Sequence, residues 1–177
     1  MDTDQVTGRA EGAPVLRKLT LFVVDLAGYT RGVAEADALD LARFLDRYYR
    51  LAGGEVRARG GRVVKFMGDA CFATFPEEGC VAAVDCAQSI VGLLDARREP
   101  FFSGVGANVH LASVAEGALG ADDDRRYDVV GAGVNHLFRM GGGAGIRISE
   151  PVYRQLPDDR RGAWHKHKPP ATYMLRC

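Results

Sequence analysis

The chain has 177 residues, of which 47% are hydrophobic and 26% are charged, a composition typical of one globular domain with its own core. Its 23 Lys and Arg residues balance 23 Asp and Glu residues, so no basic excess points to nucleic acid or an anionic membrane as a partner. No apolar run approaches the roughly 20 residues that cross a bilayer. We therefore expect a cytoplasmic protein that binds neither nucleic acid nor a membrane.

The start of the chain, residues 1–16, is polar and rich in Gly and Ala, and it does not resemble a signal peptide. We expect it to be a flexible tail that precedes one domain over residues 17–177. The cysteines form no CxxC pair, so we predict reduced, structural thiols rather than metal ligands. They are Cys71, Cys80, Cys86 and Cys177.

Apolar patterns in the first half of the chain predict a strand, a helix, a hairpin and a second helix. The expected strands span residues 18–25, 63–67 and 71–75, and the expected helices span residues 34–57 and 81–96. The first strand (KLTLFVVD) contains β-branched residues and ends at the carboxylate Asp25. Gly68 and Asp69 separate the second and third strands, which is a strong hairpin signal.

The second half predicts further strands and shorter helices. The expected strands span residues 102–110, 111–119 and 146–148, the helices span 134–140 and 150–156, and a charged loop spans 121–126. A terminal strand pair is expected over residues 164–175, with Pro169 and Pro170 at its turn. This order of elements predicts an α/β sandwich, with helices on one or both faces of a mixed sheet.

Two carboxylates stand at places where strands end. Asp25 closes the first strand and Asp69 lies at the hairpin tip, so on neighbouring strands of one sheet they can meet. Such a pair suits Mg²⁺ or Mn²⁺, which bind carboxylates together with substrate phosphates. The alternative for each residue alone is a purely structural role, because Asp is common in turns.

Other polar residues interrupt apolar runs or lie at a strand-to-helix turn. The turn after the first strand (LAGYT) offers backbone N–H groups that suit a phosphate. Lys65 in VVKFM and Asp128 in YDVVG are charges that are costly unless they face a cleft or a partner. Asn135 and Arg139 are four residues apart and lie on one face of a helix.

Taken in order, the segments LFVVDLAGYT, VVKFMGDACFATF and YDVVGAGVNHLFRM resemble the class III nucleotidyl cyclase catalytic domain. The resemblance extends from about Lys18 to the end of the chain, so we expect no attached sensor domain. It implies an α/β (α+β) fold of the ferredoxin-like βαββαβ type. It also implies a homodimer that pairs head to tail, with two active sites that are each built from both protomers.

The resemblance implies that one protomer supplies a metal and phosphate half-site. Asp25 and Asp69, with the backbone of Leu26, would bind two Mg²⁺ or Mn²⁺ ions. The β- and γ-phosphates of a nucleoside triphosphate would lie against the backbone of the following turn. This turn consists of Leu26 and the residues after it, namely Ala27, Gly28, Tyr29 and Thr30.

The other protomer would supply the second half-site. Lys65 and Asp128 would read the base, Asn135 would orient the ribose, and Arg139 would brace the reacting phosphate. In this chemistry the 3′-hydroxyl attacks the α-phosphorus, expels pyrophosphate and forms a cyclic nucleotide, with two metal ions clamping the triphosphate. A rigid guanidinium suits the charge that then develops on the phosphate oxygens.

The residues leave the base of the substrate open between adenine and a pyrimidine. Lys65 donates hydrogen bonds and ionised Asp128 accepts them, which matches adenine and disfavours guanine. Cytosine presents the same acceptor and donor edge, so the pair cannot separate ATP from CTP. We narrowly favour ATP and cAMP. A pyrimidine cyclase that makes cCMP or cUMP in antiphage signalling is the main alternative, and Phe66, beside Lys65, would shrink the base pocket. A cyclase-like domain that only binds is the third possibility.

Overall fold

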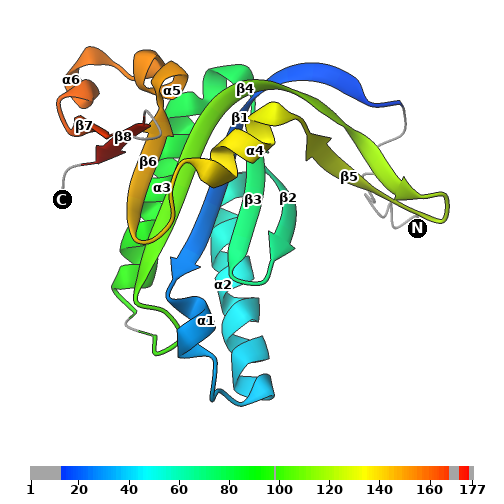
Figure 1. Ribbon diagram of the computed structural model, residues 1–177, viewed down its shortest axis with the longest axis vertical. Helices are drawn as coiled ribbons and strands as arrows, with labels where there is room; N and C mark the ends of the chain where they lie inside the picture. The colour runs from blue at the N-terminus through cyan, green and yellow to red at the C-terminus, as the bar shows by residue number, and fades with distance from the viewer. Residues whose placement is uncertain (1–12, 98, 168–171, 176–177) are drawn as a thin grey trace, which may run out of the picture.

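The computed structural model describes residues 13–97, 99–167 and 172–175, and it is built around one mixed, eight-stranded sheet (Figure 1). The strands hydrogen-bond in the order β2-β3-β1-β4-β6-β8-β7, and β5 pairs with β4 beside this path. The strands are β1 (Val15–Ala27), β2 (Arg62–Met67), β3 (Ala70–Phe75), β4 (Gly104–Ala121), β5 (Asp124–Val130), β6 (Gly145–Ser149), β7 (Trp164–His167) and β8 (Thr172–Leu175).

Two long helices and several short ones connect these strands. They are α1 (Tyr29–Gly32), α2 (Ala38–Ala58), the 3₁₀ turn η1 (Glu77–Gly79), α3 (Cys80–Asp95), α4 (Ala132–Arg139), α5 (Glu150–Gln155) and α6 (Asp158–Arg161). Asp37 begins α2, because its carboxylate accepts hydrogen bonds from the amides of Leu39 and Asp40. The helix ends before Gly60, whose φ of 77° suits glycine. Among the described residues, none of these helices has the length and hydrophobicity needed to span a membrane.

The ferredoxin-like expectation is confirmed. The first four strands of that arrangement lie in the order β2-β3-β1-β4, and β1 is antiparallel to both of its neighbours. Helix α2 connects β1 to β2 and α3 connects β3 to β4, as a βαββαβ chain requires. Beyond this unit, β6 adds parallel to β4, which makes the sheet mixed.

The two faces of the sheet are covered differently, because side chains of β1 alternate between them. Phe22 and Val24 point into a large core with α2 and α3. Leu21 and Val23 point to the opposite face, where they pack with Leu137 of α4. Of the helices that the structure describes, α2 and α3 lie behind the sheet in Figure 1, and the short α4 lies in front of it. Most of this front face is therefore left without a helix.

Several expected boundaries were wrong. The two strands expected over 102–119 are a single strand, β4, and the charged stretch expected as a loop over 121–126 belongs largely to a hairpin with β5. Val15 and Leu16 lie in β1 rather than in a tail, because they pair with Glu116 and Ala115. Helices α1 and α6 were not predicted. The terminal strand pair is confirmed as β7 and β8, whereas Pro169, Pro170 and Cys177 lie outside the described residues.

Candidate active site

Asp25 and Asp69 converge at one end of the sheet. The last paired residues of β1 and β3 there are Val24 and Cys71, so Asp25 and Asp69 lie one and two positions beyond that pair. Both carboxylates line a cavity of about 630 Å³. The turn that was expected to hold phosphate lines the same cavity, together with residues of two other loops. The remaining lining residues are Leu26, Ala27, Gly28, Tyr29, Thr30, Arg31, Ser103, Gly143 and Ala144.

Glycines make room beside Asp25. It lies across from Gly106 of β4, which in turn lies across from Gly145 of β6. A Cβ atom at Gly106 would come within 2.5 Å of Asp25 Oδ1 and of the Gly143 carbonyl oxygen. Burial raises the pKa of Asp25 above the ordinary 3.8, Asp69 raises it further, and Arg147 opposes the shift. The site is thus a partly desolvated place of concentrated negative charge.

The turn from Leu26 to Thr30 is held open by the segment before β4. The backbone amide and the hydroxyl of Ser103 both donate to the Ala27 carbonyl, at 2.7 and 3.0 Å. Gly28 adopts a φ of 78°, and a side chain there would collide with the Ser103 hydroxyl. The turn therefore keeps its backbone facing the cavity, and the guanidinium-bearing Arg31 lines the same cavity.

Helix α2 supports the other carboxylate through the hairpin turn. Tyr49 donates a hydrogen bond of 2.7 Å to the carbonyl of Gly68, next to Asp69. The Tyr49 ring also stacks on Phe66, with ring centroids 4.1 Å apart. Phe66 packs with the α2 and α3 core, on the opposite face from Lys65. The expectation that Phe66 narrows a base pocket is therefore wrong, because successive residues of a strand point to opposite faces.

Lys65 and Asp128 meet on the front face of the sheet. The Lys65 ammonium donates to Asp128 Oδ2 at 2.6 Å, and the other carboxylate oxygen accepts from the Val129 amide. Lys65 is cross-strand from Phe72, which belongs to the front-face cluster. Their side chains are 43% and 27% exposed, so an ammonium donor and a carboxylate acceptor stay accessible to a ligand.

Helix α4 carries Asn135 and Arg139, which are both exposed. The helix lies close along β4, because a Cβ atom at Gly133 would be only 2.4 Å from that of Ala112. The described residues that line the cavity beside Asp25 do not include Lys65, Asp128, Asn135 or Arg139. The structure thus brings Asp25 and Asp69 together with the turn in one cavity, and it joins Lys65 to Asp128 elsewhere. Asn135 and Arg139 lie exposed on α4.

The residues around Asp25 fit a small divalent ion in chemistry. No group of three or more His, Cys, Asp and Glu side chains that could hold a metal occurs among the described residues. Two carboxylates beside an open cavity match Mg²⁺ or Mn²⁺, which take few protein ligands and share the rest with substrate oxygens.

Two buried polar residues of this region escaped the sequence analysis. Asn108 of β4 and Arg147 of β6 are 6% and 9% exposed, and they are paired across the sheet. Their side chains bind the backbone between α4 and β6, which includes the cavity residues Gly143 and Ala144. The signal that singled out Lys65, a charge inside an apolar run, also applies to Arg147 in IRIS.

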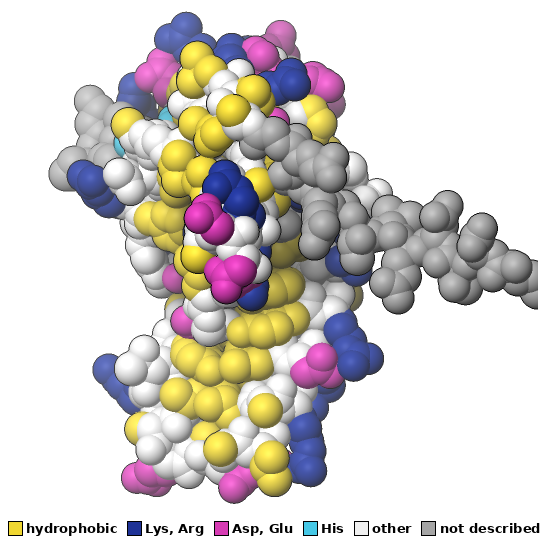
Figure 2. Space-filling model, turned by 90° about the vertical axis from the view of Figure 1, so that its right-hand side faces the viewer, with side chains coloured by type: hydrophobic (Ala, Val, Ile, Leu, Met, Phe, Trp, Pro, Cys, Tyr) yellow, Lys and Arg dark blue, Asp and Glu magenta, His cyan; other side chains and the backbone are white. Residues whose placement is uncertain are grey.

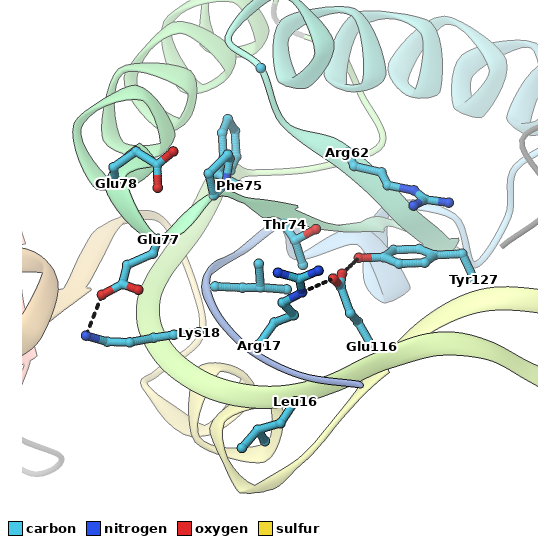
Figure 3. A pocket seen from close by; sticks show the side chains of 13 residues that line it. Leu16, Arg17, Lys18, Arg62, Thr74, Phe75, Glu77, Glu78, Glu116 and Tyr127 are labelled. Carbon is cyan, nitrogen blue, oxygen red and sulfur yellow. Dashed lines mark hydrogen bonds and ion pairs between the residues drawn. The ribbon is translucent and has the colours of Figure 1, made fainter. Parts of the chain in front are cut away.

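A second cavity of about 560 Å³ lies at the opposite end of the sheet, near the start of β1 (Figure 3). Arg62 of β2 stacks on the Tyr127 ring at 3.4 Å, and the Tyr127 hydroxyl donates to Glu116 at 2.6 Å. Burial is the main cause that raises the pKa of Tyr127 to about 12, so the hydroxyl stays protonated. These contacts join β2 to β5 a short distance from Lys65 and Asp128.

Comparison with known proteins adds sequence and fold relatives. No known protein-family profile matches the chain. An adenylate cyclase of Anabaena cylindrica is 29% identical over 161 residues, which cover 82% of this chain and 32% of that protein. The chain thus spans about a third of the length of this curated relative.

Solved structures of cyclases share the fold. The adenylyl cyclase CyaB from P. aeruginosa has a TM-score of 0.81 and 20% identity, with 94% of this chain and 97% of that chain covered. The guanylyl cyclase Cya2 has a TM-score of 0.75 and 19% identity, with 93% of each chain covered. The chain thus shares its fold with these two cyclase structures, and its sequence is similar to that of the Anabaena adenylate cyclase.

Proposed function

We propose that the chain cyclises a nucleoside triphosphate to a 3′,5′-cyclic nucleotide and pyrophosphate. The observation that carries this proposal is the division of its polar residues into two half-sites. Asp25, Asp69 and the turn from Leu26 to Thr30 share one cavity, whereas Lys65 and Asp128 form an ion pair away from it. The first half-site would bind the triphosphate of the nucleotide. The second, together with Asn135 and Arg139, would contact its base and ribose.

A homodimer with shared active sites follows from this division. Of the described helices, α4 alone lies on the front face. Large apolar side chains on this face or near it are exposed, namely Met67, Val130 and Phe138. Figure 2, which views the side where β2 and β5 lie, shows apolar side chains gathered between charged ones. A second copy that packs head to tail would cover this face and bring Asn135 and Arg139 to the cavity of its partner.

The chain's own residues account for binding and orientation. Backbone N–H groups of the turn would hold the β- and γ-phosphates, and Asn135 would align the ribose for in-line attack on the α-phosphorus. Arg139 would meet the negative charge that develops as pyrophosphate leaves. Two Mg²⁺ or Mn²⁺ ions at Asp25, Leu26 and Asp69 would supply Lewis acidity and charge neutralisation when bound.

The pair of Lys65 and Asp128 favours ATP. After their ion pair is formed, the ammonium keeps further N–H donors and the carboxylate keeps lone pairs, which match the ring nitrogen and amino group of adenine. Guanine presents the reverse edge. Cytosine presents the same edge as adenine, so CTP is the specific second candidate that this pair supports.

The test is a product assay with the purified protein, each of the four nucleoside triphosphates and Mn²⁺, read by mass spectrometry. We expect cAMP from ATP, and Asp25→Ala or Arg139→Ala to reduce its rate by about 100-fold or more. Cyclic product from CTP or UTP in place of ATP would identify a pyrimidine cyclase. Nucleotide binding without product from any of the four would overturn the cyclase proposal and indicate a domain that only binds.

A further inference from the structure

Arg147 is a buried cation whose hydrogen bonds go to one short loop. Its guanidinium donates to the carbonyls of Gly142 at 2.7 Å and Gly143 at 3.2 Å, and at 3.4 Å to those of Ala144 and Gly145. Arginine is rarely so buried unless it is paired, because removing its charge from water is costly. The loop carbonyls offset part of this cost and are in turn fixed in direction by a rigid, planar group.

Asn108 extends this arrangement to the end of α4. Its side-chain amide donates to the Leu137 carbonyl at 3.1 Å and to the Gly141 carbonyl at 3.0 Å. The Leu137 carbonyl also accepts from the Met140 amide at 3.4 Å, so Asn108 adds a second hydrogen bond at the end of α4 and joins that end to the loop at Gly141. Since Asn108 and Arg147 are directly paired across β4 and β6, we name the two together the loop clamp.

The loop clamp touches both half-sites of the protomer. On one side, Gly143 and Ala144 line the cavity beside Asp25, and the Gly143 carbonyl packs tightly against Gly106. On the other side, the loop follows directly from α4, which carries Asn135 and Arg139. Four of the five residues from 141 to 145 are glycine, and a glycine-rich segment has no fixed shape unless something holds it.

We propose that Asn108 and Arg147 are positioning residues that hold the two half-sites of each protomer in a fixed relation. The inference rests on the proposed function, in which these half-sites belong to two different active sites of the dimer. Loosening the clamp in one chain therefore weakens both active sites to which that chain contributes. The loss falls on kcat more than on KM, because the clamp does not hold the groups proposed to bind the nucleotide. Lys65 and Asp128 lie on β2 and β5, and the phosphate-binding turn is held by Ser103.

A heterodimer separates the two contributions. A chain with Asp25→Ala, mixed with a chain with Arg139→Ala, leaves one intact active site, while both homodimers lack an essential group. Arg147→Met is then added either to the Asp25→Ala chain, where it affects the α4 half-site, or to the Arg139→Ala chain, where it affects the carboxylate half-site. Arg154→Met is the matched control, because Arg154 is exposed and pairs with Glu150, four residues away on the same helix.

We expect Arg147→Met to lower kcat by about 10- to 100-fold in either placement, as loss of a supporting contact commonly does. KM should change by less than threefold, and the control should leave kcat within twofold. A kcat within twofold of the parent in either placement overturns the inference. If the heterodimer without Arg147→Met is inactive, the shared-site proposal is overturned. The role of the loop clamp is then decided by hydrogen exchange.

Hydrogen exchange tests the clamp without activity. In the homodimer, Arg147→Met should speed amide exchange in peptides that span α4 and residues 141–145 by about tenfold, while peptides of α3 keep their rates. Asn108→Ala, a smaller change, should act in the same direction and serves if Arg147→Met fails to fold. Unchanged exchange in both variants overturns the inference, whatever the activity shows.

Discussion

Asp25 carries its charge in a place where burial and Asp69 both disfavour that charge. Because its pKa in the folded protein lies above the ordinary value of 3.8, the ionised side chain destabilises the metal-free fold at pH values above that raised pKa. We expect Asp25→Asn to raise the melting temperature at pH 7 in a chelator, with a gain that shrinks as the pH falls toward 3.8. Cyclase activity should fall by about 100-fold or more. Thermal melts over a pH series and the product assay measure both effects.

Asp122→Asn is the control for this substitution at the same scale. Asp122 is exposed in the turn between β4 and β5, and surface changes of this kind usually alter stability by less than about 0.5 kcal/mol. Its melting temperature and its activity should match those of the wild type. A melting temperature of Asp25→Asn at or below that of the wild type at pH 7 would show that the carboxylate is not strained in the fold.

At the scale of elements, side chains rather than backbone join β2 to β5. In the described part of the chain, β2 pairs with β3 and β5 pairs with β4, so Lys65 reaches Asp128 only while the two strands stay close. Arg62 on the Tyr127 ring is a second such contact. A cation–π contact at an exposed place contributes about 0.5–1 kcal/mol, so Arg62→Met should raise the KM for the nucleotide by about two- to fivefold with little change in kcat.

Arg17→Met is the matched control for Arg62→Met. Arg17 lines the same cavity and lies 3.6 Å from Glu116, but it does not contact Tyr127 in any interaction shown in Figure 3. Steady-state kinetics of the two variants should therefore differ in KM alone. Equal KM values for both variants and the wild type would show that the stacking contact does not support the pair of Lys65 and Asp128 that we propose to bind the base.

The same elements show what could be predicted from the sequence. Asp69 was placed at a hairpin tip because Gly68 and Asp69 separate two apolar runs, and this local signal survives in any tertiary setting. β5 was missed because its charged sequence (DRRYDVV) resembles that of a loop. A strand that pairs with β4 needs to bury only one of its faces, so its other face can carry charged residues. The partners of Arg147 were beyond prediction, since they depend on how a glycine loop folds over β6.

For the whole molecule, activity should depend on association, because the proposed active site needs a half-site from each of two protomers. Phe138 is 44% exposed on α4 and contacts Phe72 on the front face, so a charge there opposes packing by a second copy. We expect Phe138→Glu to shift the protein from dimer to monomer in light scattering and to lower activity at least about tenfold, with the folded state retained. Leu93→Glu, at 43% exposure on α3 behind the sheet, should leave both mass and activity unchanged. Wild-type protein that stays fully active per chain after dilution to a monomeric mass would mean that one protomer holds a complete site.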